Sequence, residues 1–341
     1  MIVSGPAIRA VAASARVTLL CGPVGESAAR ALPGVDDVVV WDCPWISNPA
    51  PRATPESIQQ LTDLLGDDIP EEAVILTSFH QSPLPLALVL RLAGVGRVSG
   101  ASVDYPGSLL DVRLRPGEDL QEDQPEPLRA LRIAAAAGFP LPPEDDGLLR
   151  VRYDDDVSDL LGDDTEPFVA VHPGASVPSR RWPAGRYWAA VRLLAEKGVR
   201  VVVTGSPAER ELTAYVSGGL ATDLGGRTDF GSMGGVLARA GALIAGNTGP
   251  AHLAAAVGTP VVSLFSPILP AIRWAPYGVP VVLLGDQEEA CRGTRARECP
   301  LPGHPCLAGV TPEEAVDACL RLAAPRLAEI PRVQLQNGQL S

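Results

Sequence analysis

Short apolar runs alternate with segments of helical period along the second half of the chain. From residue 168 onward these runs lack the in-and-out alternation of a half-buried strand, and most are followed by a segment with apolar residues three and four positions apart. Fully apolar strands separated by helices are typical of a parallel sheet covered on both faces. The pattern therefore predicts a doubly wound α/β domain over residues 151–330. The strands are expected at 168–172, 199–204, 223–224, 242–245, 260–265 and 279–284, and the helices at 184–197, from 207, 231–239 and 310–328.

The first half of the chain repeats this pattern less cleanly. It predicts a second α/β domain over residues 1–150, and the acidic, proline-rich segment 141–166 interrupts the periodicity between the two domains. Residues 331–341 are mostly polar, and we expect them to form a flexible tail. The strands of the first domain are expected at 17–21, 38–41, 73–78 and 97–99, and its helices at 6–15, 25–32, 55–65 and 83–93.

The first domain enters a helix unusually early, after residues 1–5 only. In a doubly wound domain the first strand commonly lies in the middle of the sheet. We therefore expect the N-terminal domain to lack its first strand. That loss would leave backbone groups of two neighbouring strands without partners.

The composition, with 46% hydrophobic and 20% charged residues, is that of a soluble protein with a large core. The net charge of −12 and the single lysine, Lys197, argue against a nucleic-acid partner, because no basic stripe can follow a phosphate backbone. No apolar run approaches the roughly 18 residues of a membrane-spanning helix, and the N-terminus lacks the order of a secretory signal. We expect a cytoplasmic protein with reduced cysteines.

The most informative segment is 246–253, which follows an apolar run. The expected strand ends in small residues, and a helix then starts with Thr248 as its N-cap and Pro250 in its first turn. Free backbone N–H groups and the helix dipole attract an anion at such a start, so we expect a phosphate or diphosphate here. Asn247 belongs to the same loop, and His252, one turn further on, either faces the ligand or packs into the sheet.

A second candidate segment, 179–183, joins a strand end to a helix start. Its adjacent Arg180 and Arg181 could clamp a diphosphate, because guanidinium groups match phosphate oxygens and stay charged. A solvated basic turn is the alternative interpretation.

Two polar pairs at strand ends admit both a structural and a ligand-binding role. Ser206 and Glu209 have the spacing of a capping box, and the carboxylate could also accept hydrogen bonds from ribose hydroxyls. His80 and Gln81 follow a strand of the first domain, where they could contact a second substrate. Capping of the next helix by Ser82 is the alternative there.

Three cysteines, Cys291, Cys299 and Cys306, lie with His304 in a loop rich in proline and glycine. Their spacings lack the close Cys-x-x-Cys pairs of a zinc site, so a metal site is disfavoured and none is assigned. The chain also lacks a glycine-rich dinucleotide motif after a strand, a Walker lysine loop and a Gly-x-Ser-x-Gly elbow. These absences weaken the dehydrogenase, NTPase and serine-hydrolase interpretations.

Together these segments resemble the heptosyltransferases of glycosyltransferase family 9. The resemblance rests on HPGAS, SRRWP, TGSPAERE, the run from DLGGRTDF to GTPVVSLFSP and the pair Arg273-Trp274, and it extends through CRGTRARECPLPGHPCL. Weaker similarity reaches back to SGPAIRAVAAS and SFHQSPLPLALVLRLAGV, so the resemblance covers nearly the whole chain.

The resemblance implies the GT-B architecture, two Rossmann-like domains facing a cleft, with a nucleotide-sugar donor held by the C-terminal domain. It implies inverting transfer of a sugar, heptose or a related one, from a nucleotide-diphosphate donor, most often ADP-activated, to a hydroxyl of a cell-surface glycan or glycolipid. A lipid-linked acceptor would bring the enzyme to the inner face of the cell membrane as a peripheral contact. No cofactor is required, and a divalent cation is compatible with the scheme but not implied.

The segments and the resemblance together define the expected site. His80 and Gln81 are expected on the acceptor side. The residues expected to bind the donor are Ser179, Arg180, Ser206, Glu209, Asn247, Thr248, Gly249, Pro250 and His252.

The sequence departs from the family's pattern at two places. Asn247 stands where many members have Asp. The family's first loop ends in Gly-Asp, whose Asp is taken as the catalytic base, and the matching position here falls directly before Met1. We expect that Met1 is an internal methionine of a longer natural protein, and we leave the catalytic residue unassigned. A catalytically impaired nucleotide-sugar-binding protein stays open as an alternative, and so does a sugar-nucleotide epimerase, ranked last.

Overall fold

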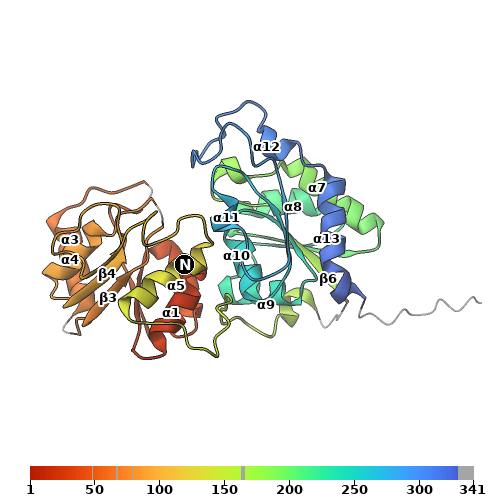
Figure 1. Ribbon diagram of the computed structural model, residues 1–341. Helices are drawn as coiled ribbons and strands as arrows, with labels where there is room; N and C mark the ends of the chain where they lie inside the picture. Colours follow the sequence, from red (N-terminus) through yellow and green to blue (C-terminus); the bar gives the residue numbers. More distant parts are fainter. Residues whose placement is uncertain (48, 67, 79, 163–165, 329–341) are drawn as a thin grey trace, which may run out of the picture. The chain divides into compact units, whose positions relative to one another are not determined.

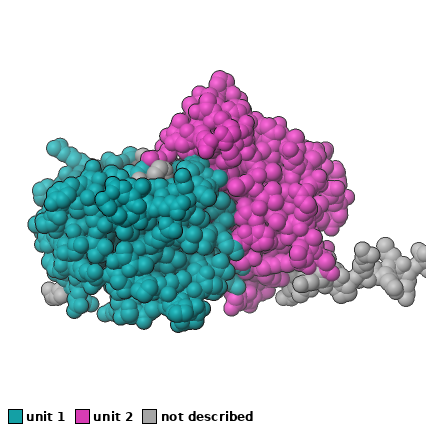
Figure 2. Space-filling view, in the orientation of Figure 1, with its two compact units in different colours: residues 1–154, 255–257, 269–278 teal, residues 155–254, 258–268, 279–341 magenta. Residues whose placement is uncertain are grey.

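The computed structural model describes residues 1–47, 49–66, 68–78, 80–162 and 166–328. The chain forms two compact units, which Figure 2 distinguishes by colour. The expected tail at 331–341 lies outside the described residues. The first unit comprises residues 1–154, 255–257 and 269–278, and the second comprises 155–254, 258–268 and 279–341.

The second unit is a parallel sheet with helices between its strands (Figure 1). Its strands are β6 (Phe168–His172), β7 (Arg200–Gly205), β8 (Thr222–Gly225), β9 (Leu243–Gly246), β10 (Val261–Leu264) and β11 (Val281–Leu284). Its helices are α6 (Ser158–Leu161), α7 (Ala184–Glu196), α8 (Arg210–Ser217), α9 (Phe230–Arg239), α10 (Gly249–Ala256), α12 (Pro305–Ala308) and α13 (Pro312–Leu327), with the 3-10 turns η3 (Pro178–Arg180) and η4 (Pro207–Glu209).

The six strands have the order β11-β10-β9-β6-β7-β8, and all neighbours are parallel. Counted along the unit, this is the 3-2-1-4-5-6 order of a Rossmann fold. The chain direction across the sheet therefore reverses between β6 and β9, which pair directly. The prediction of a doubly wound domain is confirmed.

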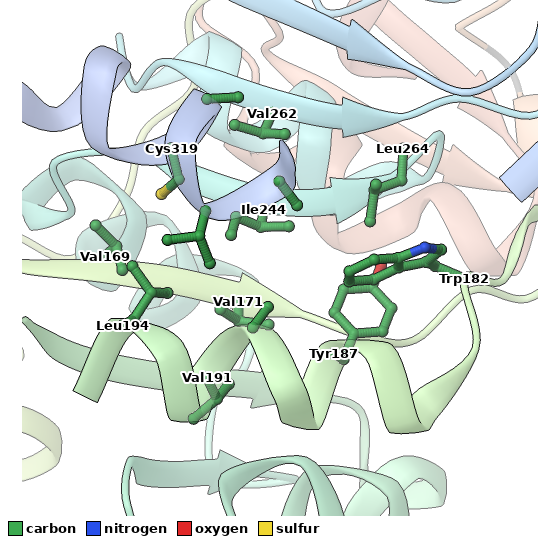
Figure 3. Close-up of a cluster of buried hydrophobic side chains, with 14 of the residues drawn as sticks. Val169, Val171, Trp182, Tyr187, Val191, Leu194, Ile244, Val262, Leu264 and Cys319 are labelled. Carbon is green, nitrogen blue, oxygen red and sulfur yellow. The ribbon is translucent and has the colours of Figure 1, made fainter. Parts of the chain in front are cut away.

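Apolar strand residues of the second unit are covered on both faces of the sheet. Val169 and Val171 of β6 belong to a buried cluster with residues of α7 and α13, including Val191 and Cys319 (Figure 3). Ala170, between the two valines, points the other way and is also fully buried. Two-sided burial explains why the strands read as unbroken apolar runs.

The first unit contains the remaining elements. Its strands are β1 (Thr18–Cys21), β2 (Asp37–Val40), β3 (Glu72–Ile75), β4 (Arg97–Ala101) and β5 (Val112–Leu114). Its helices are α1 (Gly5–Ala12), α2 (Glu26–Ala31), α3 (Pro55–Leu65), α4 (Leu84–Leu92), α5 (Glu126–Ala137) and α11 (Ala271–Trp274), with the 3-10 turns η1 (Ile2–Ser4) and η2 (Pro23–Gly25).

The strands of the first unit form two parallel sheets, β1-β2 and β3-β4-β5. Within the described residues no strand pairs with both β1 and β3. Apolar side chains nevertheless link the two sheets: Leu20 of β1 and Val89 of α4 belong to one cluster, and α4 also packs on β3 and β4 through Ala87 and Leu90. Among the described strands, β1 and β3 are therefore not joined in one sheet.

The pattern of the first unit predicts neither β5 nor α5. Helix α5 buries Ala130, Ile133 and Ala134, and it packs against Ala7 of α1. Its apolar residues are mostly alanines, so its amphipathic stripe is weak in the sequence. Across the described residues, no helix has both the length and the apolar character that spanning a membrane requires.

Candidate functional site

The reversal of strand order brings two of the candidate segments together. β6 ends at His172, and Pro173 and Gly174 follow it; its neighbour β9 ends at Gly246, and Asn247 follows. In doubly wound sheets, ligands bind beyond the carboxyl ends of the strands at this switch point. The structure therefore brings two segments that are far apart in the sequence to the position where such sheets bind ligands.

Helix α10 starts at this point as predicted. It begins at Gly249, directly after Thr248, and Pro250 is its second residue. The first backbone N–H groups of a helix have no partner within the helix, and the helix dipole adds partial positive charge there. His252, one turn further, is half-buried, and loss of solvation is the main cause that lowers its pKa to about 4, with a contribution from Arg180.

Arg180 reaches this helix start from η3. Its Nη1 donates to the backbone oxygen of Asn247 at 3.4 Å. Its backbone oxygen lies so close to Gly246 that a Cβ there would be only 2.8 Å away. Burial, and then the charge of Arg297, lower the pKa of Arg180. Its Nε has no hydrogen-bond partner in the described part of the chain, so this donor lacks an acceptor that an acidic ligand could supply.

Asn247 is 5% exposed, and neither its side-chain oxygen nor its nitrogen has a hydrogen-bond partner among the described residues. Buried polar groups are nearly always paired, because an orphan group costs free energy. Two orphan atoms beside the Arg180 guanidinium indicate that a polar ligand completes the site.

Aromatic residues hold the Arg180 loop and the end of β9 in place. Trp182 follows Arg180 and Arg181, is 2% exposed, and donates from Nε1 to the backbone oxygen of Val310 at 3.2 Å. Its ring meets that of Tyr187 edge-on, with centroids 4.8 Å apart (Figure 3). The backbone of Gly246 donates to the Tyr187 hydroxyl, although burial still raises the pKa of that hydroxyl. The core therefore positions both sides of the candidate anion site.

Ser206 and Glu209 form the predicted capping box. The backbone N and the Oγ of Ser206 both donate to Glu209 Oε2, each at 2.8 Å. Nearby, His172 Nδ1 lies 3.0 Å from Thr204 Oγ1. Burial lowers the pKa of His172 to about 4, against the opposing charge of Glu209, so the imidazole is neutral at pH 7. Glu209 thus presents a half-buried carboxylate at the same edge of the sheet.

The residues on either side of Arg180 have other partners. Ser179 is 1% exposed, and its Oγ donates to the backbone oxygen of Ala296 at 2.5 Å. Arg181 is exposed and donates from Nε to the backbone oxygen of Ala175 at 2.8 Å. Of the two adjacent arginines, it is Arg180 that contacts the loop before α10.

The six cysteine thiols are free in the structure. Burial raises the pKa of Cys306 to about 11, and it also raises that of Cys291. His304 Nε2 lies 3.0 Å from the backbone oxygen of Ser179. Among the described residues, no three His, Cys, Asp or Glu side chains are grouped so that they could hold a metal ion.

Two cavities of the first unit lie at the carboxyl ends of β3 and β4. One, of about 170 Å³, is lined by Thr77 and Ser78, which follow β3. The other, of about 190 Å³, is lined by His80 and by Ser102, which follows β4. Gln81 lines both cavities. The structure therefore brings both predicted acceptor-side residues to cavity walls.

A buried ionic network lies behind these cavities, within the first unit. Arg129, which lines both cavities, donates from Nη1 to the Thr77 oxygen at 2.5 Å and from Nε to Glu122 at 3.3 Å. Arg273 donates to Glu126 at 3.0 Å and also to Glu122. Burial raises the pKa of Glu126, against the charges of Arg129 and Arg273.

A family model described as glycosyltransferase family 9 (heptosyltransferase) matches residues 128–304, just over half of the chain. The chain belongs to glycosyltransferase family 9. The matched stretch contains the Arg180 loop, the capping box at Ser206 and the start of α10.

Two curated relatives of this family 9 chain are heptosyltransferases. Lipooligosaccharide heptosyltransferase 2 of Haemophilus ducreyi is 26% identical over 175 residues, 48% of this chain and 50% of the relative. Lipopolysaccharide heptosyltransferase 1 of Pseudomonas aeruginosa is 34% identical over 157 residues, 45% of this chain and 42% of the relative. The matches thus span half or less of these relatives.

Solved structures resemble the family 9 chain over nearly its whole length. The glycosyl transferase family 9 protein of Veillonella parvula has a TM-score of 0.74 at 15% identity and covers 95% of this chain and 94% of its own. The ADP-heptose LPS heptosyltransferase II of E. coli has a TM-score of 0.70 at 18% identity, with 96% of each chain covered. At such identities the likeness concerns the fold, which is GT-B with two Rossmann-like units.

Sequence reasoning missed three charged residues of this glycosyltransferase family member. Glu126 and Arg129 are three apart on α5, a spacing that places both on one helix face, but the helix itself is not predicted. Arg297 lies in the segment 291–306, which belongs to the family resemblance but contains no residue of the predicted donor site. Nothing in the sequence around Arg297 predicts that its charge lies near Arg180.

Proposed function

We propose that this chain is an inverting glycosyltransferase. It moves a sugar, heptose or a related one, from an ADP-activated donor to a hydroxyl of a cell-surface glycan or glycolipid. The observation that carries the proposal is the Arg180 guanidinium beside the buried, unpartnered amide of Asn247 at the N-terminus of α10. A diphosphate would supply the acceptors that Arg180 and the helix N–H groups lack.

Each predicted donor residue has a role in this arrangement. The diphosphate lies at Thr248 and Gly249, where the helix N–H groups are free, and Pro250 fixes the first turn. Asn247 hydrogen-bonds the phosphate or the sugar, and His252 faces the same side of the helix start as a neutral imidazole, because its pKa is low. Arg180 neutralises the diphosphate.

The nucleoside lies toward β7. Glu209 accepts hydrogen bonds from the ribose hydroxyls through its Oε1, because its Oε2 is already bonded to Ser206. Ser179 does not contact the donor itself. Its buried hydroxyl holds the loop that contains Arg180 in place.

The reaction forms a bond between the acceptor oxygen and the anomeric carbon while the bond from that carbon to the diphosphate oxygen breaks. The leaving nucleoside diphosphate keeps the electron pair, and a base takes the proton of the acceptor hydroxyl. Arg180 and the N-terminus of α10 stabilise the charge that grows on the leaving group. We assign no metal or other cofactor to these steps, and a divalent cation on the diphosphate is compatible with them.

The acceptor lies on the first unit, at the cavities lined by His80 and Gln81. Met1, Val3 and Ser4 line the neighbouring cavity, which Gln81 also lines. A lipid-linked acceptor would place the enzyme at the inner face of the membrane as a peripheral contact.

Turnover of nucleotide sugars tests this proposal. The protein is incubated with ADP-heptose or other nucleotide sugars and a lipopolysaccharide-core acceptor, and nucleoside diphosphate release is measured. Arg180→Ala and Thr248→Ala should lower kcat/KM by roughly a hundredfold or more, as for other lost transition-state donors. Unchanged kinetics would refute the site. Donor binding without turnover would favour the impaired binding protein, and donor conversion without acceptor would favour an epimerase.

A further inference from the structure

The loop between β11 and α12 runs along the carboxyl edge of the second unit's sheet. The backbone N of Gly293 donates to the Pro267 oxygen at 2.9 Å, and that of Arg295 donates to the Ile268 oxygen at 3.0 Å, both just beyond β10. The loop therefore crosses the edge at which the donor is proposed to bind.

The same loop is fastened to Ser179, the residue before Arg180. The backbone N of Ser179 donates to the Arg297 oxygen at 3.0 Å, and its Oγ donates to the Ala296 oxygen at 2.5 Å. His304 Nε2 lies 3.0 Å from the Ser179 oxygen. Three hydrogen bonds thus tie residues 296–304 to a single buried residue, which fixes the backbone of Arg297 beside the Arg180 loop.

Arg297 places a second positive charge beside Arg180. The side chain of Arg297 is exposed, and no described carboxylate forms an ion pair with it. The charge of Arg297 is near enough to disfavour the protonated form of Arg180, so the two guanidinium groups repel each other in the free protein. A net charge of −12 makes two unpaired arginines at one sheet edge unusual for this chain. An anion between them would turn the repulsion into attraction.

We infer that Arg297 is a second guanidinium ligand of the donor diphosphate, opposite Arg180. This inference rests on the proposed function and adds a residue to that same site. Two planar guanidinium groups match the oxygens of two linked phosphates better than one, because each can donate two parallel hydrogen bonds. The tether to Ser179 positions the backbone before the ligand arrives, which lowers the ordering cost of binding.

Binding of inorganic pyrophosphate and of ADP tests the inference. Pyrophosphate contains the diphosphate without a nucleoside, so it reports on the diphosphate site alone, whatever base the enzyme prefers. Affinities are measured by titration calorimetry for the wild-type chain, Arg297→Gln, Arg297→Lys and Arg180→Gln. Arg292→Gln is the matched control, because Arg292 lies on the same loop, is exposed, and pairs with Glu288.

Arg297→Gln should weaken pyrophosphate and ADP binding by roughly ten- to a hundredfold, the range expected for a charge-assisted hydrogen bond. Arg297→Lys keeps the charge but loses the paired donors of the guanidinium group, so its affinity should lie between those of Arg297→Gln and the wild type. Arg292→Gln should equal the wild type. If Arg180→Gln weakens binding but Arg297→Gln does not, the inference is wrong while the proposed function stands. If the wild type binds neither probe, both fail. Equal melting temperatures without ligand establish that the variants are folded.

Discussion

The carboxylate of Glu209 packs directly against Gly174. A Cβ at position 174 would overlap both carboxylate oxygens of Glu209. Moving the carboxylate aside would break the two hydrogen bonds that Ser206 donates to it. The turn after β6 and the turn after β7 therefore fit together only because residue 174 has no side chain.

Gly174→Ala should displace the Glu209 carboxylate from its capping position. We expect ADP affinity to fall roughly tenfold, since one hydrogen-bonding group loses its geometry, and we expect the unfolding midpoint to drop. Calorimetry and thermal unfolding measure the two effects. Gly22→Ala is the control, because a Cβ at position 22 meets no atom within 4 Å and the backbone there is extended. If Gly174→Ala bound ADP with wild-type affinity, Glu209 would not be a contact of the nucleotide.

Glu209→Gln tests the ribose contact separately from the diphosphate. Glutamine can still complete a capping box, so the turn should keep its shape. It replaces a charged acceptor of the ribose hydroxyls with a neutral one, and we expect ADP to bind about tenfold more weakly. Pyrophosphate has no ribose and should bind as it does to the wild type. An equal loss for both probes would place Glu209 at the phosphates instead.

The fold of the second unit is predictable because its signals are local. Runs such as 168–171 and 242–245 are apolar at every position, and a segment of helical period follows each of them along the chain. The start of α10 after Thr248 and the box at Ser206 and Glu209 depend on residues one to three apart, so the sequence alone specifies them. The candidate anion site at the switch point is predicted from these same short-range patterns.

The unpredicted parts of the candidate site depend on contacts between distant residues. The Ser179 hydroxyl meets Ala296 across 117 sequence positions, and Arg273 meets Glu126 across 147. No period or spacing encodes such pairs. Residues 269–278 belong to the first unit for a similar reason. Arg273 in this segment donates to Glu122 and Glu126, which are far from it in the sequence.

Stability should fall as the pH drops, partly because of His172. Burial holds its pKa at about 4, below the 6.5 of an exposed histidine. Between these values the unfolded chain binds a proton that the folded chain does not, so the stability present at pH 7 is lost from about pH 6.5 down to 4. In His172→Asn the free energy of unfolding should therefore fall by about 1–3 kcal/mol less over this range. The low pKa of His252 contributes a further part of the decline. Unfolding midpoints of the wild type and of His172→Asn at pH 7, 6 and 5 measure this loss of stability. If the midpoints of both proteins fell equally with pH, His172 would not be its cause.

Arg273→Met should destabilise the first unit strongly. Arg273 is 4% exposed and Glu126 is 6% exposed, so the variant leaves a buried carboxylate with Arg129 as its remaining cation. Loss of one partner of a buried pair costs about 3 kcal/mol.

The effect of Arg273→Met should depend on pH. Burial already raises the pKa of Glu126, and loss of Arg273 raises it further. A folded-state pKa above the unfolded one means that stability decreases as the pH rises through that range. The variant should therefore be closer to the wild type at pH 5 than at pH 8, and adding Glu126→Gln should remove the difference. Thermal unfolding measures both.

Arg292→Met, which breaks an exposed pair, should change stability by less than about 0.5 kcal/mol. Equal losses at the two pH values would mean that Glu126 does not carry the effect.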